Sequence, residues 1–579
     1  MNKIKNIIKE HKWMLILAFL TGALMVLPQV IFITQAGNDY KGINILATDN
    51  EANFLARFQE IAEGDWGFSD IFLTFDKNVS YQRPYLGQVI MYRFGQIFFL
   101  STYQIHLLAK FILPAILFLM IYFFVLLFEP EKKIALASSA GIMLWYGISS
   151  ISDFKSFLGN NLVISGPSVF SRPVIPVLGI IILFSFLSFF YLYIIQSKKR
   201  YYWLSGIFFG LSFYIYFFTW SFLTVFVFVS AFWFLVKKDW LNLKKILEVI
   251  FLGAFIALPY WFNFYKLINY QAFDSLAGQA GLVFSQSIII GKYLIAALLL
   301  YFLLLYTKRI KGINFWFWSC LIVSFIVILN QQLITHRVLQ PGHYHWYIIK
   351  PLTVILFIWF ISNLIQNKCK KCFGLLVIIL IAGGFYLLIS QQIFIYYQFK
   401  DEVALYSQRY ASIYSWLNQN TIQNQIIFSG ILGINQRCLM SAYTHLDEYL
   451  YKNKALYPYS LALNKYILFL EYRLNKITPE TAKELFFNDL RKDIFYEIYG
   501  YYYRITYLDK GESVPDERVW EIIDEYTYFY QQDLEAEFKK YPIDYMIWDR
   551  QLNPQWNLDG FDFLQLIHQV NNVGIYKFL

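Results

Sequence analysis

Charged residues are scarce in this chain. Asp, Glu, Lys and Arg make up 15% of its 579 residues, whereas 58% of the residues are hydrophobic and 21% are aromatic. A soluble domain carries roughly 25% charged residues, because its surface faces water. The composition therefore excludes an ordinary soluble enzyme and predicts an α-helical polytopic membrane protein.

Cysteine is scarce as well, and the excess of positive charge has no nucleic-acid pattern. Four cysteines do not provide the disulfide framework of a small secreted domain. Cys369 and Cys372 form a lone CxxC without a second pair, which disfavours zinc or redox use. The net charge of +10 comes from short basic clusters between apolar runs, as in the cytoplasmic loops of membrane proteins. We therefore expect membrane lipids as partners and no nucleic acid.

The apolar runs predict about 11 transmembrane helices. The basic segment 2–12 precedes the first run without a convincing cleavage site after it, so we expect a retained signal-anchor with its N-terminus inside. The run 203–236 is too long for one helix, and we divide it near Phe218. The expected spans are 13–34, 103–128, 134–150, 173–196, 203–218, 219–236, 244–263, 288–306, 313–332, 347–366 and 373–396.

The basic clusters orient these spans. Clusters such as 3–9, 198–200 and 368–371 all fall on one side, and an odd number of spans then places the C-terminus outside. We predict a multi-pass plasma-membrane protein with a transmembrane domain at 1–400, whose long first outer loop is 36–84. An extracytoplasmic domain at 401–579, α/β or helix-rich, should hold strands at 425–429 and 541–548 and helices at 401–417, 480–499 and 517–540.

The first outer loop opens a helix. Thr48 and Glu51 form a capping box, so we expect a helix that begins here and ends near Gly64. Glu51 projects from the apolar face of this helix toward the protein body. Two explanations stay open, a cap partner of Thr48 or a functional acid. The apolar face holds Phe54, Leu55, Phe58, Ile61 and Ala62, and the polar face holds Asp49, Asn53, Arg57 and Glu60.

Basic side chains gather at the outer ends of the spans. The apolar centres hold no Asp, Glu, Lys or Arg, apart from Glu248 near a cytoplasmic end, which disfavours an ion-coupled transporter. Cations at outer ends run against the positive-inside bias, so they need anionic partners. Those partners are lipid headgroups, acids of the outer domain, or the phosphate of a lipid. The residues are His106, Lys110, Arg172, Lys292, His343, His345 and Lys350.

The layout of the chain resembles that of the GT-C membrane glycosyltransferases. It consists of one span, a long outer loop that opens an acidic helix, many further spans and an outer C-terminal domain. These include the protein O-mannosyltransferases and the aminoarabinose transferases, which use polyprenyl-phosphate-linked sugars. The likeness covers residues 1–400 in layout. The family's Asp-Glu pair, followed after two residues by Tyr, corresponds here to Asn50-Glu51-Ala52-Asn53-Phe54, with Asp49 one place early. Either Asp49 replaces the first acid, or Glu51 does its work, or transfer activity is lost.

Three more stretches are similar to outer-facing sites of the family. Asp153, in 150–161, matches a second acid or is only a helix-terminus acid. Arg172 suits a phosphate, or marks an ordinary helix boundary before Pro173. In 330–346, Arg337, His343 and His345 are candidates for sugar or phosphate contact, and a metal site that also includes His336 is the less favoured alternative.

The resemblance implies an inverting transfer of a sugar from a polyprenyl-phosphate donor to a glycan, lipid or protein acceptor on the outer face. Asp49, Glu51 and Asp153 are the catalytic candidates, with Asp49 as the base. The candidates for binding the donor phosphate or sugar are Arg172, His343, His345, Lys350 and Arg337. No metal ligand is assigned, and a divalent cation is an alternative cofactor. The competing hypotheses are a flippase or transporter of a lipid-linked glycan and a non-catalytic envelope-assembly protein.

Thiol labelling tests the orientation. A membrane-impermeant reagent should label Cys438 in intact cells and leave Cys369 and Cys372 unlabelled, because the basic clusters place the CxxC pair inside. Peptide mass spectrometry reads all three positions. Labelling of the CxxC pair but not of Cys438 overturns the orientation and the placement of every candidate site.

Overall fold

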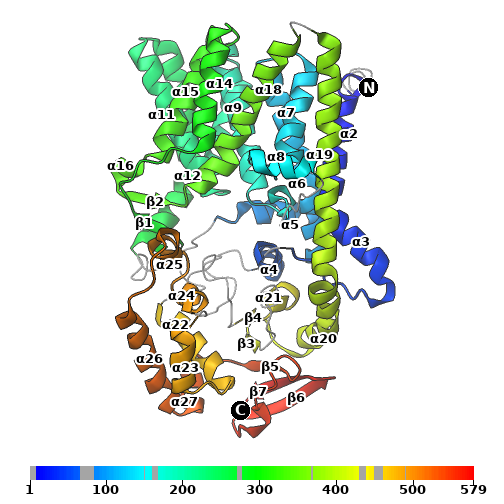
Figure 1. Ribbon diagram of the computed structural model, residues 1–579, viewed down its shortest axis with the longest axis vertical. Helices are drawn as coiled ribbons and strands as arrows, with labels where there is room; N and C mark the ends of the chain where they lie inside the picture. The colour runs from blue at the N-terminus through cyan, green and yellow to red at the C-terminus, as the bar shows by residue number, and fades with distance from the viewer. Residues whose placement is uncertain are drawn as a thin grey trace.

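The protein consists of a bundle of apolar helices and a mixed α/β C-terminal region at one end of that bundle (Figure 1). The computed structural model describes residues 8–47, 49–64, 84–148, 150–159, 167–269, 277–278, 280–366, 369–429, 439–448, 461–488 and 491–579. The side chains of Asp49 and Asn50 are not among the described parts. We call the helix ends that face the C-terminal region the site end of the bundle.

Six helices of the described chain are long and apolar enough to cross a membrane, and a pair of helices bent by 52° forms either a seventh, broken span or a re-entrant loop. That pair is α2 (Lys12–Met25) with α3 (Leu27–Ala36). These helices identify a helical membrane protein, whereas the finer count of 11 spans stays a prediction. The six are α6 (Thr102–Leu126), α9 (Val177–Gln196), α11 (Phe217–Val236), α15 with α16 (Ile313–Thr335), α17 to α18 (Gly342–Gln366) and α19 (Lys370–Phe399).

The remaining helices of the bundle are shorter or less apolar. The run 203–236 breaks between α10 (Lys199–Ser212) and α11, a few residues before the predicted division at Phe218. The run 134–150 forms a helix only as far as Leu144 (α7, Lys132–Leu144), so the predicted end was wrong. The other members are α12 (Trp240–Ile268), α14 (Lys292–Tyr306) and α5 (Leu86–Gln96).

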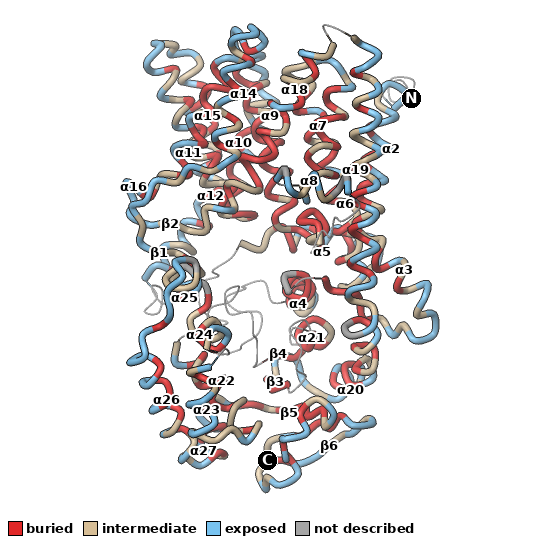
Figure 2. The backbone as a smooth tube through the Cα atoms, in the orientation of Figure 1, coloured by how far each residue is buried: buried red, intermediate tan, exposed pale blue. Residues whose placement is uncertain are grey.

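The outward faces of the bundle expose large apolar side chains. Phe232 is 67% exposed, Phe251 is 74% exposed and Tyr306 is 86% exposed, and Figure 2 shows the buried residues along the inside of the bundle. Contiguous apolar surface of this extent is unfavourable in water. The exposure pattern therefore suits helices that are surrounded by lipid.

The C-terminal region contains a five-stranded sheet of order β4-β3-β5-β7-β6. The strands β3 (Ile426–Ser429) and β5 (Tyr545–Asp549) confirm the two predicted strands and pair in parallel. The predicted helices 480–499 and 517–540 are each interrupted, as α23 (Pro479–Phe487) with α24 (Arg491–Tyr499), and α26 (Asp516–Gln531) with α27 (Leu534–Lys540). Three further strands were not predicted from the sequence: β4 (Asp447–Glu448), β6 (Leu564–Val570) and β7 (Val573–Phe578).

The predicted opening helix is α4 (Asp49–Glu63), which lies between the bundle and the C-terminal region (Figure 1). It ends at Gly64, whose φ of +95° ends the helix where the sequence predicts. The helix packs on α5, on α6 and on α21 (Leu439–Tyr443) of the C-terminal region. Both of its faces are enclosed, because Arg57 and Glu60 of the polar face are also buried.

The cysteines refine the labelling test. Cys369 and Cys372 form a disulfide at the start of α19. Cys438 lies outside the described residues. Because a disulfide does not react with thiol reagents, the CxxC pair should be labelled in permeabilised cells only after reduction, and that reduced sample is the positive control.

Candidate functional site

A buried ion pair joins α4 to the bundle at its site end. The Nζ atom of Lys110 on α6 lies 2.7 Å from Oε2 of Glu51, and Glu51 has no exposed surface. One turn earlier on α6, Nε2 of His106 lies 3.8 Å from the same carboxylate oxygen. Glu51 thus points into the protein body, as the sequence predicts. Its ionic partner is Lys110, whereas the capping partner Thr48 lies outside the described residues.

The environment of Glu51 combines desolvation with positive charge. Burial raises the pKa of the Glu51 carboxyl, and Lys110, Arg172 and the backbone amide of Ala47 oppose that rise. Removing one member of such a pair leaves the other charge buried and uncompensated, which costs far more than the pair itself contributes. Glu51 is therefore well suited to hold α4 against α6.

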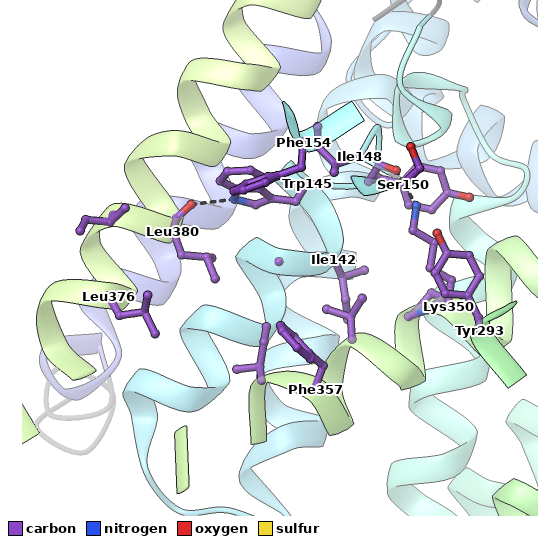
Figure 3. Close-up of a pocket in the computed structure, with 16 residues that line it drawn as sticks. Ile142, Trp145, Ile148, Ser150, Phe154, Tyr293, Lys350, Phe357, Leu376 and Leu380 are labelled. Carbon is purple, nitrogen blue, oxygen red and sulfur yellow. Dashed lines mark hydrogen bonds between the residues drawn. The ribbon is translucent and has the colours of Figure 1, made fainter. Parts of the chain in front are cut away.

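An apolar groove of about 680 Å³ lies between α7, α18 (Lys350–Gln366) and α19. Figure 3 shows Leu376 and Leu380 of α19 on one side, Ile142 of α7 and Phe357 of α18 beside them, and Lys350 with Tyr293 at the polar end. The indole of Trp145 donates a hydrogen bond to the carbonyl of Leu380 and so ties two walls together. The groove thus has an apolar body and a cationic end.

Lys350 sits in an aromatic box at that end. Its Nζ atom donates a hydrogen bond of 2.6 Å to the Tyr146 carbonyl and lies 4.1 Å from the centre of the Tyr146 ring. The same atom is 5.0 Å from the Trp346 ring and 5.6 Å from the Tyr293 ring. Lys292 contacts two of these rings, at 5.3 Å for Tyr293 and 5.8 Å for Trp346. Two cations thus share one aromatic surface, which concentrates positive charge in a poorly hydrated place.

His345 belongs to this cluster and His343 does not. The His345 ring lies 4.8 Å from the Tyr293 ring and packs on Gly291, where an added Cβ would approach its Cε1 atom to 2.3 Å. His343 instead forms a 2.6 Å hydrogen bond through Nδ1 with the Tyr216 hydroxyl, at the start of α11. Although the two histidines are only two residues apart in sequence, their rings contact different residues.

Arg172 connects the groove to the ion pair. Its guanidinium interacts electrostatically with the Glu51 carboxylate and with the Tyr146 hydroxyl. The adjacent Phe170 packs its ring 4.9 Å from the Tyr146 ring. Ser171 lines a small cavity beside Lys110, together with Ile45 and Ala47. The segment 168–172 therefore reaches from the cationic end of the groove to the buried carboxylate.

The other candidates are placed less centrally. Asp153 lies on α8 (Ile151–Leu158), within electrostatic range of Lys350, and Ser150 caps this helix by accepting a hydrogen bond from the Asp153 amide. Arg337 is exposed on β2 (Arg337–Leu339), which pairs with β1 (Leu282–Phe284) at the edge of the bundle (Figure 1). Asp49 begins α4, and its side chain lies outside the described parts.

The described residues contain no group of three His, Cys, Asp or Glu that is arranged to hold a metal ion. His336, the third member of the sequence-based metal alternative, contacts the Gln286 amide at 2.8 Å. His336, His343 and His345 therefore do not converge, because each ring has its own neighbour. A divalent cation at Asp49 stays a hypothesis.

The sequence does not reveal the aromatic box as a whole, nor the groove. It predicts aromatic stacking from Trp346 in the stretch 330–346, whereas Tyr146 and Tyr293 come from separate segments and only the enrichment of aromatic residues near span ends pointed to them. Comparison of the chain with protein-family models and with curated proteins finds no match.

A double-mutant cycle tests the ion pair. Glu51→Gln and Lys110→Met should each lower the free energy of unfolding by about 3 to 5 kcal/mol, because each leaves one buried charge uncompensated. The double variant should recover much of that loss. Thermal unfolding of the detergent-solubilised protein measures all three.

The matched control is an exposed pair. Glu535 and Lys539 lie 2.6 Å apart, close to the distance in the buried pair, but they are solvent-exposed on α27, so Glu535→Gln should cost less than about 1 kcal/mol. A cap role alone predicts that Glu51→Gln is harmless, since Gln also serves in a capping box. Unchanged stability of Glu51→Gln would contradict the structural role of the ion pair.

Proposed function

We propose that this protein is a membrane glycosyltransferase that moves a sugar from a polyprenyl-phosphate donor to an acceptor on the outer face of the plasma membrane. The observation that carries the proposal is the groove whose apolar body ends on Lys350, with Arg172 between this end and the carboxylate of α4. The first part suits a lipid tail and the second suits a phosphate, and the third leads to α4, whose first residue we propose as the base.

The groove suits a lipid tail in size and lining. Its volume of about 680 Å³ lies within the range of ligand sites. Carbon side chains from three helices form its walls, and such a surface gains free energy by covering an isoprenoid chain. A glycan that crosses the membrane needs a polar path, which this lining does not offer. The groove therefore favours an enzyme with a lipid-linked donor over a carrier of the glycan itself.

The cationic end suits a phosphate. Lys350 is only 4% exposed, and its contacts in the described structure are a carbonyl and aromatic rings, with the Asp153 carboxylate within electrostatic range but forming no ion pair with it. Lys292 and His345 share the same aromatic surface, and Arg172 lies on the side of the carboxylate. A phosphate bound here gains charge-assisted hydrogen bonds in a place where water competes weakly.

The proposed reaction is an inverting displacement. The oxygen of an acceptor hydroxyl attacks the anomeric carbon of the sugar, and the bond between that carbon and the phosphate oxygen breaks. The electron pair of that bond stays on the polyprenyl phosphate, where Lys350 and Arg172 stabilise the growing negative charge. The hydroxyl proton passes to a carboxylate, for which we propose Asp49 at the start of α4. Glu51 and Lys110 position that helix start.

Donor binding tests the cationic end. Lys350→Met and Arg172→Gln should each weaken the binding of a polyprenyl-phosphate sugar by about 2 to 4 kcal/mol, because each removes a cation from a poorly solvated phosphate. Lys266→Gln is the control, because Lys266 is an exposed cation in the last turn of α12 and is not among the donor-binding candidates. Microscale thermophoresis in nanodiscs gives the dissociation constants. Equal affinities in all four proteins would refute the phosphate site.

Asp49→Asn tests the base. The substitution keeps shape and hydrogen-bonding capacity but removes the ionisable group, so sugar transfer should slow by about two to four orders of magnitude. Thermal stability should stay unchanged, in contrast to Glu51→Gln. Transfer of radiolabelled sugar from the donor lipid, measured next to the unfolding temperature, separates the two residues. A parent protein that binds the donor but transfers no sugar to acceptor or water rules out the enzyme.

A further inference from the structure

A second cleft, separate from the lipid groove, lies between the C-terminal region and the segment before α4. It has a volume of about 320 Å³. One wall is the α20 helix (Ala411–Asn420) with Tyr443, and the other is formed by 41–43 and Tyr103 at the start of α6. Neither the proposed donor nor the proposed base occupies this cleft.

The walls of the cleft are rigid and aromatic. The rings of Tyr414 and Tyr443 stack at 5.9 Å with an interplanar angle of 8°. The Tyr443 hydroxyl accepts a 2.8 Å hydrogen bond from the Asn44 amide across the cleft, and Asn418 donates to the Tyr443 carbonyl. Asn418 also accepts from the His445 amide. These contacts fix the wall, so a ligand would meet a surface that is largely formed in advance.

The lining has the chemistry that recognises neutral sugars. Besides tyrosine rings it offers the Ser415 hydroxyl and the Gln419 amide at the exposed mouth, with Lys41 as its one cation, and its described residues hold no carboxylate. Tyrosine rings cover the apolar C–H faces of sugars, while hydroxyl and amide groups exchange hydrogen bonds with their hydroxyls. Peptides usually pair with a sheet edge or lay an apolar helix face into a groove, and this cleft offers neither.

The cleft and the small cavity at Lys110 are lined by the same two segments of the chain. Ile43 lines the cleft, whereas Ile45 and Ala47 line the small cavity at Lys110, immediately before α4. On α6, Tyr103 lines the cleft and Lys110 the cavity, seven residues apart, which is about 10 Å along a helix. A ligand that fills the cleft and reaches the start of α4 is therefore longer than one sugar ring.

We infer that this cleft binds an oligosaccharide, which is the acceptor of the transfer reaction. The role of acceptor rests on the proposed function. The binding of a saccharide to this cleft does not, because it needs no lipid-linked donor. The non-reducing end of the saccharide lies toward the start of α4, and the next rings lie on Tyr103 and Tyr443, while the buried Tyr414 ring supports Tyr443 from behind. A glycan acceptor thereby replaces the open choice among glycan, lipid and protein.

Saccharide binding to the full chain in nanodiscs tests the inference. The probes are neutral tetrasaccharides of glucose, galactose, mannose and N-acetylglucosamine, with saturation-transfer NMR as the readout. At least one should bind. Ser415→Trp fills the exposed mouth and should weaken that binding about tenfold or more. Ser412→Trp makes the same substitution at an exposed position of the same helix outside the cleft lining, and should change the affinity less than about twofold.

The outcomes separate this inference from the proposed function. Binding that Ser415→Trp abolishes and Arg172→Gln leaves intact supports the cleft, even if no sugar is ever transferred from a lipid donor. Absence of binding for every tetrasaccharide overturns the inference, and donor binding at Lys350 is untouched by that result. Equal loss in Ser415→Trp and Ser412→Trp also overturns it, because the saccharide then binds elsewhere.

Discussion

The ion pair between Glu51 and Lys110 fixes the junction on which the rest of the structure depends. The helix α4 contacts α5 and α6 of the bundle and α21 of the C-terminal region, so its position sets how the two parts meet. Apolar packing alone permits a helix to slide or rotate, whereas a buried charge requires one partner at one distance. The pair therefore selects a single register for α4. It also sets the path of 41–47, whose residues line the second cleft and the small cavity at Lys110.

Two buried lysines at the site end differ in how their charges are balanced. Lys110 has the Glu51 carboxylate at 2.7 Å, so its charge is already balanced within the protein. Lys350 forms no ion pair among the described residues, and its carbonyl and aromatic neighbours only lower the cost of burial. Since a poorly solvated cation gains most from an anion that arrives with the ligand, Lys350 is the better candidate for binding and Lys110 for structure.

The sequence predicted what local patterns determine. Apolar length identified the spanning helices, and Glu51 could be placed inside because helical periodicity alone sets its direction. The partner of Glu51 could not be assigned, because Lys110 is 59 residues away and the sequence offers several cations at helix ends. Spacing was misleading for His343 and His345, since their backbone forms a helical turn that sends the two rings to different neighbours. The two-residue strand β4 depends on its pairing with β3, which no local pattern reports. The strands β6 and β7 form a hairpin, and its two-residue turn Asn571-Asn572 is a local signal that could have predicted both.

The geometry of the two cavities limits where a reaction could take place. The lipid groove ends at Lys350 and Tyr146, the second cleft runs along Ile43 and Tyr103, and the segments 168–172 and 41–47 both lead to the start of α4. Glu51 is sealed from both cavities by its complete burial, so its carboxylate is unable to touch a substrate without a rearrangement that breaks the ion pair. Glu51 therefore anchors α4 and does not take part in the chemistry. The proposed transfer then needs another acid on this helix, and Asp49 at its start is the residue that we propose.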